Sequence, residues 1–156
     1  MIKLAEGASE HTHQVALFSW CAVAALHGFV VADKWADGMP IGDAKALHGS
    51  NAVPELRWYH AIPNGGARGD DAKSRAIRGG QLKAEGVKVG VSDTFLPVKR
   101  GIWSGLYIEL KKPGKGSKVS EEQSEFGEFV KAQGFGFIVC YGWKEAKETL
   151  IMYLQT

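Results

Sequence analysis

A strand-like run, GLYIELK at 105–111, carries two charged residues in an otherwise apolar segment. Successive side chains of a β-strand point to opposite faces of a sheet. One face of this run is therefore aliphatic, and the other carries Tyr107, Glu109 and Lys111. A charged pair on one face of a strand belongs either to a solvated edge or to a functional site. This choice constrains how the rest of the chain can pack around the run.

The composition is that of an ordinary soluble globular domain, and it excludes several classes of protein. Of the 156 residues, 45% are hydrophobic and 23% are charged, with a net charge of +2, so affinity for a polyanion requires local clusters of Lys and Arg. Cys21 and Cys140 have neither zinc-ligand nor CxxC spacing, which favours a reducing cytoplasm. The apolar stretch 15–31 is too short and interrupted to span a bilayer, and no signal peptide precedes it, so no membrane association is expected.

The hydrophobic pattern predicts a mixed β-sheet flanked by helices in one domain, 1–156. Ser9 and Ser120 are expected to cap helices, and Gly28 and Gly134 to end them. The strand at 135–142 is apolar enough for the buried middle of a sheet. The expected elements are a helix at 9–27, a loop at 28–52 with a helical turn at 42–48, a strand at 56–62, a helix at 70–86, strands at 87–98 and 105–111, a helix at 120–134, a strand at 135–142 and a helix at 143–154.

Two acids in the central part of the chain have a spacing that suits a metal site. Asp93 lies in the first strand of an expected hairpin and Glu109 in the second, with 15 residues between them. Paired strands can bring both carboxylates to one end of the sheet, where they repel each other unless a cation or a proton intervenes. With the backbone carbonyl of Leu110 they form an oxygen ligand set suited to Mg²⁺ or Mn²⁺. Lys111 would then lie beside a water or a phosphate oxygen.

This D-x(15)-E-x-K pattern resembles the PD-(D/E)xK nuclease fold. Four further blocks are similar to the VRR-NUC branch, especially its small stand-alone phage-type members: AIPNGGARG, LKAEGVKVGVSDTFLPV, GLYIELKKPGKGSKVSEEQSEF and VCYGWKEA. The resemblance runs from Glu10 to about Leu154, with 28–52 the least matched part, a loop insertion. Ser92 replaces the usual proline, and the Val-Arg-Arg triplet that names the family is absent.

The resemblance implies roles for individual residues. It implies metal coordination by Asp93 and Glu109 with help from the Leu110 carbonyl. Lys111 is implied as the catalytic lysine and Gln123 as a support for the site. Glu10 is implied as an additional acid, supplied by the amino-terminal helix. A plainer interpretation remains for each: a surface hairpin with an ion pair, a helix-surface glutamine, and an acid that interacts favourably with a helix dipole.

Basic residues near these positions are candidates for DNA contact. The residues implied are Arg68, in a glycine-rich turn, and Lys112, Lys115 and Lys118, in the loop after the strand at 105–111. A solvated surface is the ordinary explanation for such charges. A nuclease, however, needs cations along the phosphate backbone, and no base-reading motif is evident.

The leading hypothesis is therefore a Mg²⁺- or Mn²⁺-dependent endodeoxyribonuclease. The resemblance implies selectivity for branched or nicked DNA (Holliday junctions, flaps or nicks), action as a homodimer, and a location in the host cytoplasm if a phage encodes the chain. The alternative is a catalytically silent DNA-binding module of a phage replication or packaging complex, which would bind neither metal. A third possibility, a restriction-type enzyme, would leave one discrete cut pattern on plain duplex.

Overall fold

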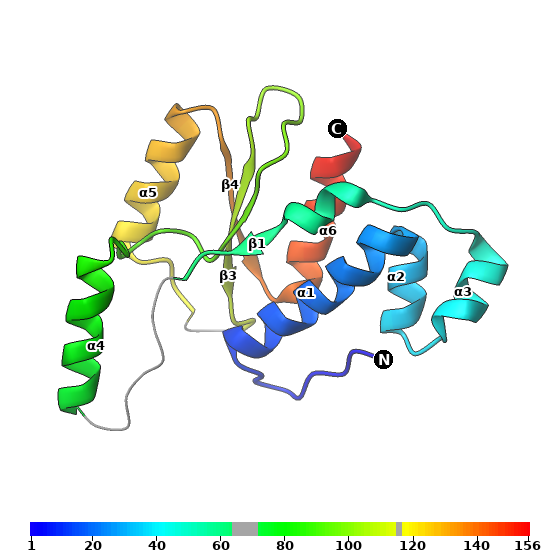
Figure 1. Ribbon diagram of the computed structural model, residues 1–156, viewed down its shortest axis with the longest axis horizontal. Helices are drawn as coiled ribbons and strands as arrows, with labels where there is room; N and C mark the ends of the chain where they lie inside the picture. The colour runs from blue at the N-terminus through cyan, green and yellow to red at the C-terminus, as the bar shows by residue number, and fades with distance from the viewer. Residues whose placement is uncertain (64–71, 115–116) are drawn as a thin grey trace.

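The computed structural model describes residues 1–63, 72–114 and 117–156. These residues form a mixed α/β fold in which one sheet separates two groups of helices (Figure 1). The elements are α1 (Glu10–His27), α2 (Phe29–Ala36), α3 (Ile41–His48), a 3₁₀ helix η1 (Pro54–Trp58), β1 (His60–Ala61), α4 (Ala72–Ala84), β2 (Thr94–Leu96), β3 (Leu106–Lys111), α5 (Glu121–Ala132), β4 (Gly136–Tyr141) and α6 (Trp143–Gln155).

The four strands of the described residues lie in the order β1-β2-β3-β4. The β1–β2 and β2–β3 pairs are antiparallel, whereas β3 and β4 are parallel and connected by α5. Helices α1 and α6 contact one side of the sheet, α5 packs on β4, and α2 and α3 extend the layer of α1 (Figure 1). The predicted fold class, a mixed sheet flanked by helices, is confirmed.

Strand β3 is buried along one face and at the charged end of the other, where Tyr107 is half-buried. Leu106, Ile108 and Leu110 are each at most 1% exposed and belong to the main core. On the opposite face Glu109 and Lys111 are also buried. The alternation expected at 105–111 is therefore present, and the charged pair, Glu109 and Lys111, is buried rather than solvated. An isolated ion in such a position is unfavourable, so the surrounding side chains must compensate these charges.

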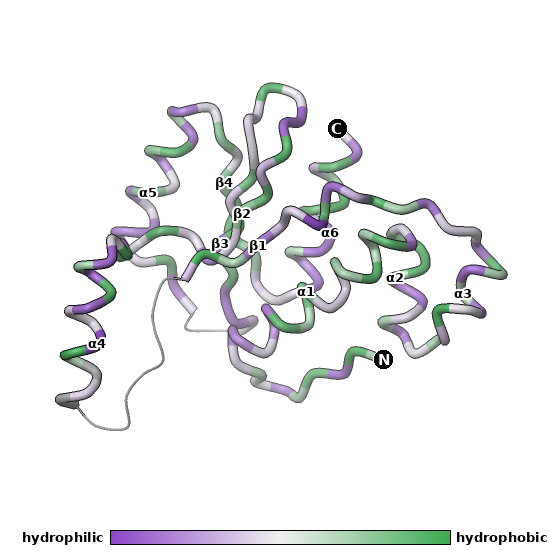
Figure 2. The backbone as a smooth tube through the Cα atoms, viewed as in Figure 1, coloured by the Kyte–Doolittle hydropathy of each residue, from purple (hydrophilic) through white to green (hydrophobic). Residues whose placement is uncertain are grey.

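Helix α1 forms the centre of the helical layer. Ser9 caps it by accepting a hydrogen bond from the Thr12 amide, and Gly28 ends it with a φ of 91°, both as expected from the sequence. Leu17 and Trp20 are fully buried along it. Figure 2 shows hydrophobic and hydrophilic segments alternating along the helices, which is the pattern of elements with one buried side.

The expected loop at 28–52 is wrong, because most of it is helical. Helices α2 and α3 fill it, and the helical turn expected at 42–48 extends to all of α3. Val31 and Ala32 are buried, and the Phe29 ring stacks on Trp20 in α1 at 5.8 Å. Gly28, Gly38 and Gly49 have positive φ and mark helix ends, whereas Gly42 lies inside α3. Two helices of eight residues are too short to show clear periodicity.

Three strand predictions also need correction. Residues 56–58 belong to η1, which begins at Pro54, and β1 keeps only two residues of the expected strand at 56–62. Residues 87–93 are not in a strand, since this segment packs on α5: a Cβ at Gly90 would collide with the backbone of Glu122. Strand β4 is at the edge of the sheet rather than in its middle, and Ile138 is 42% exposed.

The later helices match their predictions closely. Helix α5 begins after Ser120, whose hydroxyl accepts from the Gln123 amide, and α4 and α6 lie within about two residues of their expected limits. Cys21 and Cys140 are both buried free thiols. Within the described residues, none of the helices combines the length and apolar character needed to cross a membrane.

We expect Gly28→Ala to destabilise the fold. Gly28 has a φ of 91°, and a Cβ there would collide with the carbonyl of Asn51. The free energy of unfolding in urea should fall by about 2 kcal/mol or more. Gly79→Ala is the matched control, because Gly79 lies inside α4 and its Cβ would meet no atom within 4 Å. That variant should gain about 0.5–1 kcal/mol. Equal effects at both positions would contradict the assignment of the α1–α2 turn.

Candidate active site

Strands β2 and β3 bring Asp93 and Glu109 to one end of the sheet. Their register pairs Thr94 with Ile108, so its continuation places Asp93 opposite Glu109. Residues that are directly opposite on antiparallel strands point to the same face. The Leu110 amide donates to Asp93 Oδ2 at 2.9 Å. One detail of the prediction is wrong, since Asp93 lies in a bend immediately before β2 and not within the strand.

Hydrogen bonds on both sides hold Asp93 in place. The Ile62 amide, at the end of β1, donates to the Asp93 carbonyl oxygen at 2.7 Å. On the other face, the Thr94 hydroxyl donates to the carbonyl oxygen of Ile108 at 3.0 Å and contacts the Tyr59 hydroxyl at 2.7 Å. Tyr59 and Thr94 are buried. The position of Asp93 is thus fixed by the sheet itself.

Glu109, Lys111 and Gln123 form a buried polar group. Lys111 Nζ lies 2.9 Å from Glu109 Oε1 and 3.0 Å from Gln123 Oε1. Gln123 Nε2 also donates to Glu109 Oε1. The sequence pattern suggested Glu109 and Lys111, the family resemblance implied Gln123, and the structure brings the three side chains together.

The capping box of α5 orients Gln123. The Ser120 hydroxyl accepts from the Gln123 amide, and Gln123 Oε1 accepts from the Ser120 amide. The same side-chain oxygen also accepts from Lys111. The capping box that starts α5 therefore also holds Gln123 against Glu109 and Lys111.

Glu10, in the first turn of α1, lies next to the end of β3. Its Oε1 accepts from the Lys112 amide at 3.3 Å. One helical turn later, His13 is buried, and its Nδ1 accepts from the Trp143 amide at 3.3 Å. The two side chains connect α1 to the end of β3 and to the start of α6. The sequence indicated Glu10 through the family resemblance, but it did not single out His13. The spacing of three residues from Glu10 is the signal that could have identified His13.

The electrostatics of the site are dominated by Glu109. Burial, and then the nearby charge of Asp93, raise the pKa of this carboxyl group from 4.5 to about 7, although Lys111 opposes the shift. Glu10 adds a smaller contribution in the raising direction. The three acids therefore form one electrostatic unit, in which a cation would favour the ionised form of Glu109.

The donor set fits a hard divalent cation with few protein ligands. In the described part of the chain, no three His, Cys, Asp or Glu side chains are arranged as a metal-binding group. Glu109 Oε2 is nevertheless buried and has no hydrogen-bond partner among the described residues. The Leu110 carbonyl points toward the side of Asp93, because the N–H and C=O of one strand residue point the same way. Two carboxylates, a carbonyl and water suit Mg²⁺ or Mn²⁺.

The structure describes two of the four residues expected to contact DNA. Lys112 and Lys118 are exposed and lie in the connection between β3 and α5, before and after residues 115–116. Arg68 and Lys115 lie outside the described residues. Lys112 directly follows Lys111, so its main chain is next to the carboxylates and its side chain is available to solvent.

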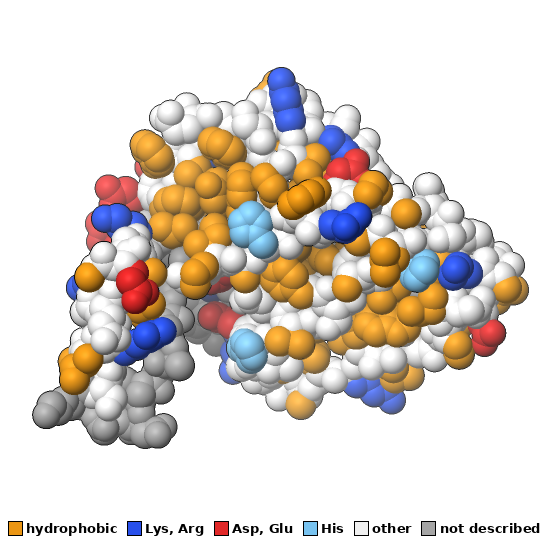
Figure 3. Space-filling view, viewed as in Figure 1, with side chains coloured by type: hydrophobic (Ala, Val, Ile, Leu, Met, Phe, Trp, Pro, Cys, Tyr) orange, Lys and Arg blue, Asp and Glu red, His pale blue; other side chains and the backbone are white. Residues whose placement is uncertain are grey.

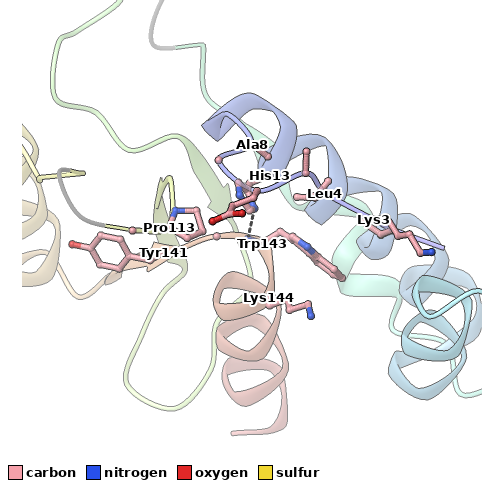
Figure 4. A pocket seen from close by; sticks show the side chains of 14 residues that line it. Lys3, Leu4, Ala8, His13, Pro113, Tyr141, Trp143 and Lys144 are labelled. Carbon is pink, nitrogen blue, oxygen red and sulfur yellow. Dashed lines mark hydrogen bonds between the residues drawn. The ribbon is translucent and has the colours of Figure 1, made fainter.

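A cavity of about 770 Å³ lies beside this site but does not include its carboxylates. It is lined by residues 2–8, His13, Pro113, Gly114 and residues 141–144. Figure 4 shows His13 pointing toward the start of α6, while the Tyr141 side chain points away. The hydrogen bond from the Trp143 amide occupies His13 Nδ1. This part of the cavity wall therefore connects α1 to α6.

The family of this chain follows from comparison with known domains. The model of the VRR-NUC domain family matches residues 66–144, about half of the chain. The chain belongs to the VRR-NUC family. Asp93, Glu109, Lys111 and Gln123 all lie inside the matched segment, whereas Glu10 precedes it. VRR-NUC membership indicates a nuclease-type function in DNA processing, with DNA as the substrate.

The fold has a counterpart among solved structures. A protein described as a "VRR_NUC domain protein" aligns with a TM-score of 0.61 and 19% sequence identity, over 97% of this chain and 92% of that one. At this identity the likeness establishes a shared fold, which includes the helices that precede residue 66. No curated protein matches the sequence at a significant level.

We expect the raised pKa of Glu109 to make stability depend on pH in the metal-free protein. Between about pH 4.5 and 7 the folded state holds a proton that the unfolded state has released. The contribution of this group is therefore full below about pH 4.5 and is lost as the pH rises through 7. We expect this loss to be visible in the presence of a chelator. As the pH is raised from below 4.5 to above 7, the free energy of unfolding of the wild type should fall by on the order of 3 kcal/mol more than that of Glu109→Gln. Parallel pH profiles of the two proteins would contradict the buried carboxylate.

Proposed function

We propose that this VRR-NUC protein is a metal-dependent endonuclease that hydrolyses phosphodiester bonds in DNA. The observation that supports it best is the convergence of Asp93, Glu109 and Lys111 at one end of β2 and β3. Two acids and a lysine on one sheet face provide a place for a cation, a water and a phosphate. Had these groups lain on opposite faces, no common reaction centre would exist.

In this proposal, Asp93, Glu109 and the carbonyl of Leu110 would hold a Mg²⁺ or Mn²⁺ ion. The ion, when bound, supplies Lewis-acid activation of the phosphate and neutralises its charge. Asp93 contributes a carboxylate fixed through the Leu110 amide. Glu109 contributes the buried Oε2, while Lys111 and Gln123 engage its other oxygen. Each carboxylate is therefore oriented by the protein before any ligand arrives.

Lys111 provides a positive charge that does not depend on a bound metal ion. Its Nζ is held by Glu109 and Gln123 and cannot swing freely into solvent. An ammonium fixed in this way stabilises the negative charge that develops on phosphate oxygens and orients the attacking water. Gln123 keeps both partners in position. Glu10 adds negative charge beside the Lys112 amide and completes the acidic cluster.

The remaining parts of the proposal concern the substrate and the assembly. Lys112 and Lys118, together with Arg68 and Lys115, would contact the phosphate backbone without reading bases. The VRR-NUC resemblance supports selectivity for Holliday junctions, flaps or nicks over plain duplex. A homodimer would supply one site for each of two strands.

We expect Glu109→Gln to remove cleavage and to leave DNA binding intact. The amide keeps the size of the side chain but loses the charge that a cation needs. Cleavage of a branched DNA in Mg²⁺ should fall by more than about a hundredfold, since changing residues that only support metal ligands already costs about 10–100-fold. Binding measured by fluorescence anisotropy should be unchanged or slightly tighter.

The matched control for this experiment is Glu128→Gln, an exposed position on α5. It makes the same chemical change away from the site and should cleave like the wild type. Wild-type cleavage by Glu109→Gln, or equal losses in both variants, would contradict the assigned role. A panel of junctions, flaps, nicks and plain duplex in Mg²⁺ and in Mn²⁺ then tests the substrate class.

We also expect Gln123→Leu to slow cleavage by about 10–100-fold. Leucine cannot bridge Glu109 and Lys111, although it fits within a helix. Ser120→Ala is the control, because it weakens the same capping box without touching either residue and should cost about 1 kcal/mol of stability. Single-turnover rates at saturating DNA distinguish the two effects. Equal rates for both variants would mean that Gln123 acts only as a helix cap.

A further inference from the structure

One face of the sheet carries a set of aromatic rings that the proposed catalytic roles do not use. This aromatic face consists of His60, Phe95, Tyr107 and Phe137 in the strands, Phe135 just before β4, and Phe126 of α5, which packs against Tyr107 and Phe137. We propose that it is a stacking surface for unpaired nucleobases of the DNA next to the cleaved phosphate. This inference rests on the proposed nuclease function and specifies part of its substrate.

The two faces of the sheet differ in how well they are covered. Under α1 and α6, Leu96, Leu106 and Ile108 are at most 1% exposed. On the aromatic face, Phe95 and Tyr107 remain half-buried and His60 is exposed. Among the described residues, α5 packs on β4, and the rings nearer β1 are only partly covered. Figure 3 shows hydrophobic side chains gathered at the surface between α5 and β1.

The aromatic face is continuous with the proposed catalytic residues. Tyr107 precedes Glu109 by two residues on the same face of β3, and Phe95 follows Asp93 by two residues beside it. Two residues of a strand span about 7 Å, which is close to the rise of two stacked bases. A DNA strand with its phosphate at Glu109 therefore has its neighbouring bases within reach of Tyr107 and Phe95.

The rings are held in fixed positions, as a stacking surface requires. Phe95 and Tyr107 stack at 4.3 Å, and Phe95 also meets the edge of Phe135 at 5.9 Å. A Cβ at Gly105 would approach the Phe95 ring to 2.8 Å, so the glycine provides the space in which this ring lies. Rings that are ordered in advance lose little entropy on binding.

The chemistry of this face favours bases over other occupants. Flat rings stack on the π-face of any base without regard to sequence, and this pattern is typical of single-strand binding proteins. Lys131 lies 5.7 Å from the Phe137 ring centre, which places a cation at the margin for the phosphates. In paired duplex the base faces are covered by their neighbours. The aromatic face therefore selects DNA that has unpaired nucleotides beside the cleavage point.

The test compares two DNA duplexes that carry a single-stranded arm of equal length and charge. One arm has normal bases, and the other consists of abasic nucleotides. Binding is measured by anisotropy in a chelator, so that no cleavage occurs. We expect the wild type to bind the normal arm about tenfold more tightly than the abasic arm. Phe95→Leu and Tyr107→Leu should each reduce that ratio toward one, whereas Tyr107→Phe should preserve it.

Phe129→Leu is the matched control, since Phe129 is 62% exposed on α5 and makes none of the ring contacts above. It should keep the full preference for bases. Equal wild-type affinity for the two arms would overturn the proposal without the need for any variant, even if Phe95→Leu failed to fold. A wild-type dimer that Phe95→Leu dissociates, with no preference for bases, would overturn it as well and would identify the face as a subunit interface.

These outcomes are separate from those of the nuclease proposal. If the wild type cleaves branched DNA in Mg²⁺ but binds both arms equally, only the stacking surface is wrong. If it prefers the normal arm but cleaves none of the panel, the stacking surface stands and the catalytic roles are wrong.

Discussion

The burial of one carboxylate, Glu109, is the constraint around which this fold is arranged. A charge on a strand that is covered on both faces is unfavourable unless other groups compensate it. Lys111 and Gln123 both engage one oxygen of Glu109, and the second oxygen has no partner among the described residues. The compensation is therefore incomplete, and the raised pKa of about 7 is its electrostatic consequence.

Each neighbouring element contributes a side chain to this end of the sheet. Helix α5 delivers Gln123 through its capping box, and the bend before β2 delivers Asp93 through the Leu110 amide. Helix α1 reaches the same place from the start of the chain: Glu10 accepts from Lys112, and His13 accepts from Trp143. Because α1 precedes the segment that the family model matches, the site combines a VRR-NUC core with a contribution from outside it.

What the sequence could predict depended on whether a signal was local. Capped helices such as α1 and α5 carry their start and end signals in adjacent residues, and their limits were predicted closely. The spacing of Asp93, Glu109 and Lys111 can also be recognised in a single sequence, because a hairpin register depends on few residues. Helix α2 was missed since its signal is the burial of Val31 and Ala32 against α1, which is a tertiary effect. The edge position of β4 likewise depends on strand order, which periodicity does not encode.

The energetics of Glu109 also bear on the choice between a nuclease and a DNA-binding module that has lost catalysis. A module needs only an exposed surface for phosphates, and replacing a buried ion pair by apolar residues is often neutral or stabilising in proteins. This chain instead keeps a carboxylate whose ionised form is disfavoured by burial and by Asp93, with a lysine and a glutamine fixed against it. Strain of this kind is characteristic of sites that pre-organise charge for a reaction. The arrangement holds a disfavoured carboxylate, a lysine and a glutamine in fixed positions, which is what the proposed nuclease function requires and what phosphate binding alone does not need.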